Sequence, residues 1–219
     1  IASVSTFTGV LTAYFWVNDP MGLGDPVMLT IFSVGLALVI ATIAGLLNGF
    51  FVSYIGIPSF MMTLAMMTIA SGMAIWVSQG KPIFAVPDFI KSLGSVSSQF
   101  LGIPVIGIFS LAILAICDVV LSYTKFGRYV YMTGANREAA EMSGVNTRRI
   151  VMYALTICAV CAGITGVLYI GRLGSANPSA GTNILIDAIA AVVLGGTSLF
   201  GGEGGIKNTF LGLLIFGVL

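Results

Sequence analysis

Long apolar runs separated by short polar turns constrain this chain more than any other feature of its sequence. Of its 219 residues, 58% are hydrophobic and only 8% are charged, whereas a soluble domain carries roughly 25% charged residues. The 9 basic and 8 acidic side chains are too few to cover the surface of a water-soluble globule of this size. The sequence therefore predicts an integral membrane protein.

The apolar runs are long enough for membrane-spanning helices, which need about 20 residues each. Lipid offers no water to unpaired backbone groups, and a barrel would show alternating strands of about ten residues, so helices are predicted. We expect spans at about 1–17, 27–54, 59–77, 103–124, 150–170 and 184–200, and a further span after 207. The last two also fit a re-entrant hairpin. The predicted fold is an all-α polytopic membrane protein with about seven spans, in a single transmembrane domain over 1–219.

Basic residues predict the orientation of the chain. The loop 125–149 contains five of the nine basic residues, namely Lys125, Arg128, Arg137, Arg148 and Arg149. By the positive-inside rule this loop is cytoplasmic. Alternation then places the turns at 56 and 201–207 on the cytoplasmic side. It places the loops 19–25, 78–102 and 171–183 outside.

Several functional classes are excluded by the residues present. The chain has no His, which excludes His-based triads and His metal sites. Its net charge of +1 provides no basic field for nucleic acid. Cys158 and Cys161 form a C-x-x-C within an apolar run and are interpreted as packing residues. The glycine-rich segment 201–208 lacks the Gly-Lys-Ser/Thr of a nucleotide loop, and Gly22–Asp25 lies in a polar loop, unlike a protease's membrane-embedded carboxylate.

The loop 125–149 is predicted to contain a short helix. Asn136 is a good N-cap, and Glu138 in the first turn suits the positive end of the helix dipole. Gly144 stands where a glycine ends a helix. Two turns are too short to be stable alone, so the helix must pack on something. It rests either on its own bundle or, the interpretation we favour, on a cytoplasmic partner.

Glycines in the apolar runs predict close helix packing. Gly45 and Gly49 have the small-xxx-small spacing that lets two helix backbones approach closely. Gly163 and Gly166 in the fifth span, and Gly212 in the last, suit the same role. A glycine hinge is the alternative.

At this point the sequence resembles a known family. Glu138, Ala139, Ala140 and Gly144 form the E-A-A-x-x-x-G pattern of ABC importer membrane subunits. The wider sequence is similar to sugar permeases of the ribose/galactose/xylose type. The similar segments are 126–129 (FGRY), 133–136 (TGAN), 143–146 (SGVN), 172–178 (RLGSANP) and 187–202 (DAIAAVVLGGTSLFGG). The resemblance is dense over 125–219 and looser before it. Members have about ten spans, so we expect two leading spans and the last one to lie outside this chain.

The resemblance implies a type II ABC importer transmembrane fold in a prokaryotic plasma (inner) membrane, as a non-enzymatic transport subunit. The short helix then docks in a separate ATPase, which binds ATP and magnesium, while this chain holds no cofactor. Further implied partners are a second, identical or different, permease subunit, membrane lipid and an external binding protein that delivers a monosaccharide such as ribose. The implied coupling residues are Arg128, Asn136, Arg137, Glu138, Ala139, Ala140 and Gly144. Alternatives are another cargo, such as a signalling furanose or a nucleoside, or a secondary carrier without an ATPase.

Candidate pathway residues are less sharply defined. Asn48 is a neutral polar group that needs a partner in the bundle. Phe60, Met62 and Met66 form a soft surface past which a sugar can slip, or they fill the core. Asp187 is either a first-turn acid near the outer surface or a pathway residue that binds sugar hydroxyls.

Overall fold

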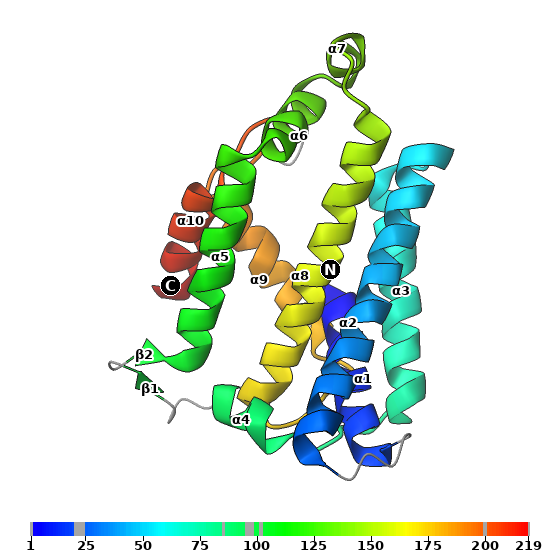
Figure 1. The fold of residues 1–219 in the computed structure, drawn as a ribbon, viewed down its shortest axis with the longest axis vertical. Helices are drawn as coiled ribbons and strands as arrows, with labels where there is room; N and C mark the ends of the chain where they lie inside the picture. The colour runs from blue at the N-terminus through cyan, green and yellow to red at the C-terminus, as the bar shows by residue number, and fades with distance from the viewer. Residues whose placement is uncertain are drawn as a thin grey trace.

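The computed structural model describes residues 2–19, 25–84, 86–94, 99–100, 103–198 and 201–218. The chain is almost entirely helical (Figure 1). The elements in chain order are α1 (Ala2–Asn18), α2 (Pro26–Phe50), the π-helical turn η1 (Phe51–Ile55), α3 (Ser59–Ser78), α4 (Asp88–Gly94), β1 (Gln99–Phe100), β2 (Ile103–Pro104), α5 (Val105–Tyr123), α6 (Lys125–Ala135), α7 (Arg137–Met142), α8 (Thr147–Leu173), α9 (Gly181–Leu194) and α10 (Ile206–Val218). Strands β1 and β2 pair antiparallel as a minimal hairpin.

Helix α1 forms the centre of the main bundle, between α2, α3 and α8. Every residue from Ala2 to Ala13 is buried, although many carry hydroxyl groups. Four of these hydroxyls, those of Ser5, Thr6, Thr8 and Thr12, donate within the helix; Thr8, for example, donates to Val4 O at 2.7 Å and Thr12 to Thr8 O at 2.9 Å. This back-bonding lets a polar sequence lie in the core without orphaned groups.

Glycines bring the helices around α1 into backbone contact. A Cβ on Gly45 of α2 would lie 2.6 Å from Ala159 Cβ of α8, and one on Gly166 of α8 would lie 2.0 Å from Ser5 O of α1. Neither distance is possible for a real side chain. The predicted role of these small residues in close packing is therefore confirmed.

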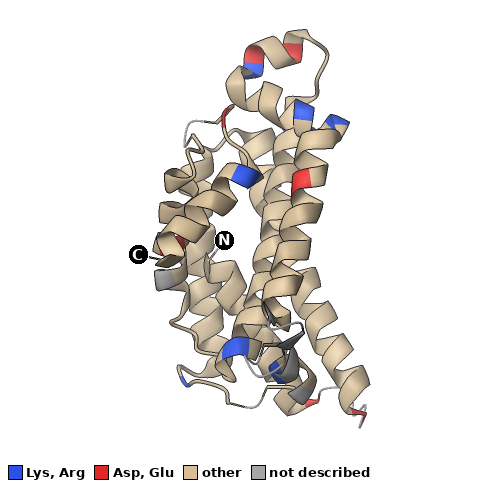
Figure 2. Cartoon of the chain, turned by 90° about the vertical axis from the view of Figure 1, so that its left-hand side faces the viewer, with Lys and Arg blue, Asp and Glu red and all other residues tan. Residues whose placement is uncertain are grey.

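Successive connections between the helices lie at alternate ends of the bundle, as the sequence predicts. The turn between η1 and α3, the helix α7 and the 201–205 turn lie at one end, and α4 and the β1–β2 hairpin lie at the other (Figure 1). Most charged residues gather toward these ends, while the helices between them are almost uncharged (Figure 2). Such a distribution suits a protein whose middle faces hydrocarbon.

Four helices are long and apolar enough to cross a membrane, which is fewer than the seven predicted spans. They are Pro26–Ile55, Ser59–Ser78, Val105–Tyr123 and Thr147–Leu173. Helix α1 has 17 residues, whereas α9 has 14 and α10 has 13. The number of seven spans is thus not confirmed among the described residues, although the all-α polytopic architecture is.

Helix α9 begins part of the way along the bundle, since the chain returns from the end of α8 through an irregular segment (Figure 1). Ala176 in that segment is 1% exposed. It exchanges two backbone hydrogen bonds with Ile83, at 3.0 and 2.8 Å. Irregular backbone at depth is tolerated only where protein groups satisfy it. The pairing with Ile83 satisfies both backbone groups of Ala176. Helices α9 and α10 follow as a hairpin of two short helices.

Two segments predicted as loops contain helices. Within 78–102 the chain forms α4, and within 125–149 it forms α6 as well as α7. Helix α6 is N-capped by Thr124, whose Oγ1 accepts from Gly127 N at 3.4 Å. Gly127 lies so close to α5 that a Cβ would be 1.9 Å from Leu121 O. Glycine has a low helix propensity even where it is required for close packing. This explains why the sequence pattern does not predict α6.

Candidate functional site

Helix α7 projects beyond the end of the bundle (Figure 1). Asn136 caps its N-terminus, where Oδ1 accepts a hydrogen bond from Ala139 N at 3.0 Å. After its C-terminus Gly144 has φ +80°, a left-handed conformation that suits glycine. The N–H of Gly144 donates to Glu141 O at 3.0 Å. The short helix and both of its end signals are therefore present where the sequence places them.

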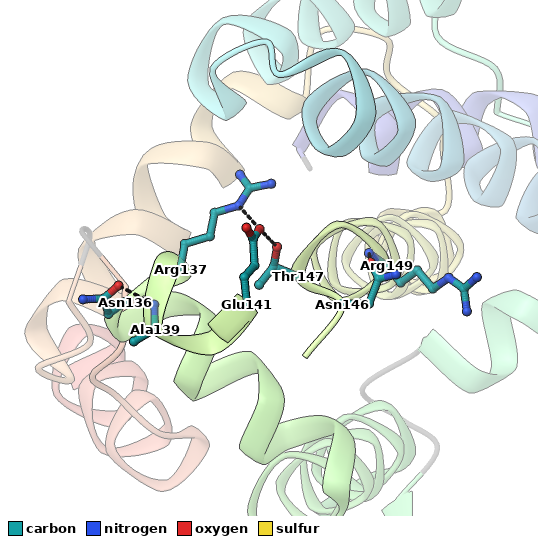
Figure 3. Close-up of polar contacts among 7 residues, drawn as sticks. All are labelled: Asn136, Arg137, Ala139, Glu141, Asn146, Thr147 and Arg149. Carbon is teal, nitrogen blue, oxygen red and sulfur yellow. Dashed lines mark hydrogen bonds and ion pairs between the residues drawn. The ribbon is translucent and has the colours of Figure 1, made fainter. Parts of the chain in front are cut away.

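Glu141 joins α7 to the first turn of α8 (Figure 3). Its Oε1 accepts a hydrogen bond from the Thr147 hydroxyl and lies 3.4 Å from Nε of Arg137. The Thr147 hydrogen bond, ahead of the opposing effect of burial, lowers the pKa of Glu141 below its usual 4.5. The carboxylate is therefore charged at neutral pH. The Thr147 contact bridges the turn at Gly144 and holds α7 against α8, while the Arg137 contact lies within α7 and orients the carboxylate.

The outer face of α7 is open to another molecule. Ala140 is 2% exposed and anchors the helix, whereas Met142 is 92% exposed. Arg137 and Glu138 are also exposed. Six residues do not form a stable helix on their own. The caps and the Glu141 contacts hold α7 in shape without covering this face.

A second contact links the same end of the chain to the α9–α10 hairpin. The Tyr131 hydroxyl of α6 donates to Gly204 O at 2.8 Å, across 73 residues of sequence. Next to it the two backbones touch, since a Cβ on Gly134 would lie 2.7 Å from Gly202 N. Helix α6, which leads directly into α7, is therefore fastened to the 201–205 turn.

One further polar contact lies beneath this turn. Lys207 Nζ at the start of α10 lies 3.9 Å from Asp118 Oδ2 of α5. The Asp118 side chain is 19% exposed, and Ser122 donates to its other oxygen at 3.3 Å. A carboxylate in an apolar helix is costly unless it is paired. The lysine and the serine reduce that cost and connect α10 with α5.

The structure brings together only part of the predicted pathway set. Asn48 of α2 and Met66 of α3 line one small cavity. Met62 is half-buried, and Phe60 is 72% exposed. Asp187 is exposed on α9, which begins at Gly181, so this acid stands in the second turn rather than the first.

The predicted coupling residues lie together, with the exception of Arg128. Residues 136–140 and Gly144 belong to α7 or its caps, while Arg128 is exposed on α6. Sequence reasoning missed the contact of Thr147 with Glu141 and that of Tyr131 with Gly204. The Arg137–Glu141 pair has a readable i,i+4 spacing, but no local signal connects Tyr131 to Gly204. Among the described residues, no three His, Cys, Asp or Glu side chains meet as a metal site requires.

Long apolar helices, with the short helix α7 projecting from one end of the bundle, define the class as a multi-pass helical membrane protein. The chain belongs to the family described as "branched-chain amino acid transport system / permease component", whose model matches residues 2–219. This family assignment, together with the relatives below, confirms the predicted resemblance to ABC sugar permeases.

Three relatives illustrate the similarity. The ribose import permease protein RbsC of Haemophilus influenzae is 34% identical over 100% of this chain and 66% of its own length. The ribose import permease protein RbsC of Bacillus subtilis is 38% identical over 78% of this chain and 53% of its own length. The D-allose transport system permease protein AlsC of Escherichia coli is 34% identical over 80% of this chain and 53% of its own length. The chain thus spans 53–66% of these relatives. No solved structure matches it significantly.

Proposed function

We propose that this chain is the core of the membrane subunit of an ATP-driven importer, which carries a monosaccharide such as ribose into the cytoplasm. ATP and magnesium bind to a separate ATPase docked on α7, and an external binding protein delivers the sugar. Two copies of the permease, or this chain and a related one, complete the assembly. The family and the names of the relatives support this proposal.

The observation that carries the proposal is the projection of α7 with an exposed outer face. The helix is braced from within by Asn136, Gly144 and Glu141, so that its exposed side chains are preorganised for a partner. An ATPase that closes on ATP would displace α7. It would bias the bundle between two conformations through its different affinity for each.

Two contacts provide routes by which a displaced α7 acts on the spans. Glu141 and Thr147 lead into α8, which packs along α1 and α2. Tyr131 and Gly204 lead into the α9–α10 hairpin. One displacement thus reaches both parts of the bundle.

The charge distribution supports a cytoplasmic position for α7. Lys125, Arg128, Arg137, Arg148 and Arg149 all belong to the segment that carries α7. Asp19 and Asp25 flank the α1–α2 connection at the opposite end. With basic residues retained in the cytoplasm, α7 faces inward across a prokaryotic inner membrane.

Co-purification of the ATPase with the full-length permease tests the proposal. Glu138→Lys reverses an exposed charge on α7, and Gly144→Trp cannot adopt the left-handed turn without strain. Both should abolish ATPase binding and sugar uptake. Asp25→Lys is the matched control, because it reverses an exposed charge at the opposite end, on a side chain that makes no cap hydrogen bond. It should bind the ATPase normally.

Retained ATPase binding and uptake in both α7 variants would refute the proposal. Uptake without any associated ATPase would instead identify a secondary carrier. The cargo is tested separately with labelled D-ribose and D-allose, because the relatives reported above are named for these two sugars.

A further inference from the structure

A small internal cavity lies where four helices of the main bundle meet. It has a volume of about 80 Å³. Helix α1 contributes Val4, α2 contributes Asn48, α3 contributes Thr63, Met66 and Met67, and α8 contributes Leu155, Cys158 and Ala159. Most of these groups are apolar, so the amide of Asn48 is the strongest hydrogen-bonding group of the lining.

Asn48 is 9% exposed, and its Oδ1 is fully buried without a hydrogen-bond partner in the structure described. Its own helix cannot satisfy this atom, because each interior N–H of an α-helix is already bonded to a carbonyl. The nearby hydroxyl of Ser53 has no such difficulty, since it donates to Gly49 O at 2.6 Å. Most buried polar atoms are hydrogen-bonded, so an acceptor without a donor points to a missing group.

The cavity lining supplies no adequate donor. The Thr63 hydroxyl already donates to Phe60 O at 3.1 Å. The thiol of Cys158 is only a weak donor. Among the described residues, the lining therefore leaves Oδ1 available to a donor from a molecule that enters the cavity.

The size of the cavity limits that molecule. A water occupies about 30 Å³ of liquid, and pockets for drug-sized ligands measure roughly 300–1,000 Å³. A volume of about 80 Å³ therefore admits two waters or one hydroxyl-bearing edge of a sugar, but not a whole sugar ring.

The walls differ in how readily they move. Gly49 packs against α8 so closely that a Cβ would lie 2.9 Å from Met152 O, which fixes the backbone next to Asn48. The facing wall carries Met66 and Met67, whose unbranched side chains adapt to what they contact. A rigid acceptor opposite adaptable thioethers suits a ligand that is held briefly and then released.

We propose that this cavity is a hydroxyl-binding site in which Asn48 Oδ1 accepts a hydrogen bond from water or from one hydroxyl of a sugar in transit. The part of this proposal that concerns a sugar hydroxyl rests on the importer function proposed above. The shared chemistry is a neutral hydroxyl donor, and the experiments below separate its two sources.

The test uses the complete importer in proteoliposomes with labelled D-ribose as the probe. Asn48→Leu has a similar volume and no polar atom, and Asn48→Ala is a second variant if the first does not fold. Ser53→Ala is the matched control, because it removes a buried polar group that is satisfied by its own helix. A water-resolved map of the wild-type complex provides an independent readout at Oδ1.

If a sugar hydroxyl is the donor, the KM for ribose rises roughly tenfold in the Asn48 variants, as expected for the loss of about 1.4 kcal/mol. ATP hydrolysis and the control keep their wild-type values. If water is the donor, KM is unchanged and density lies within hydrogen-bonding distance of Oδ1. An unchanged KM together with an empty cavity refutes the proposal. If the proposed importer function itself is wrong, the wild-type complex will not take up ribose, so this outcome is distinguished from failure of the cavity proposal.

Discussion

Removing one hydroxyl group should separate ATP hydrolysis from transport. Tyr131→Phe keeps the aromatic ring of α6 and deletes only the group that donates to Gly204 O at 2.8 Å. A neutral hydrogen bond contributes about 0.5–1.5 kcal/mol net, and an unsatisfied buried partner adds a cost of about 1–3 kcal/mol. Because this bond is only partly buried, we expect Tyr131→Phe to lose about 1–2 kcal/mol of interaction free energy. This corresponds to a 5- to 30-fold weaker attachment of α6 to the 201–205 turn.

The assay is sugar imported per ATP hydrolysed by the full-length complex in proteoliposomes. Tyr131→Phe should bind the ATPase normally and hydrolyse ATP, but should import several-fold less sugar per ATP. Tyr129→Phe is the matched control, since this exposed tyrosine lies two residues away on the same helix. Equal import per ATP in the two variants would refute the proposed route through the 201–205 turn. Loss of ATPase binding in Tyr131→Phe would refute it as well, because the hydroxyl would then serve docking.

Two further predictions concern stability and pH. Gly166→Ala should lower the thermal midpoint markedly, because its Cβ would lie 2.0 Å from Ser5 O, and overpacking costs about 1–3 kcal/mol or more. Gly35→Ala, with nothing within 4 Å of its Cβ, should leave the midpoint unchanged or raise it, and equal effects would contradict the packing argument. The pKa of Glu141 is lowered chiefly by the Thr147 hydrogen bond. Its contribution is therefore complete above pH 4.5 and is lost as the pH falls through the lowered pKa. In an NMR titration, Thr147→Val should raise the pKa of Glu141. An unchanged pKa would show that the Thr147 hydrogen bond is not what lowers it.

The elements that the sequence predicts well depend on neighbours along the chain. The N-cap at Asn136 and the left-handed Gly144 follow from residues three or four positions away. The apolar runs predict α2, α3, α5 and α8, because length and composition alone decide whether a helix suits lipid. Helix caps and apolar runs can therefore be predicted from the sequence without any tertiary information.

The predictions that failed concern contacts between one element and another. Helix α6 was hidden because Gly127 serves packing against α5 rather than flexibility. The segment before α9 is irregular, and its Ala176 pairs with Ile83, which lies in a loop nearly a hundred residues earlier. Neither contact leaves a periodic signal in the sequence.

The sequence by itself determined that the chain lies in a membrane, that it alternates between two faces, and that a capped helix follows the fourth span. Each of these results depends on hydrophobicity or on short-range hydrogen bonding. Only the tertiary structure decided that α1 is central, that Tyr131 reaches Gly204, and that Asn48 faces a cavity without a donor. The reason is physical: a helix presents several faces, and the identity of each neighbour depends on how all the other helices pack.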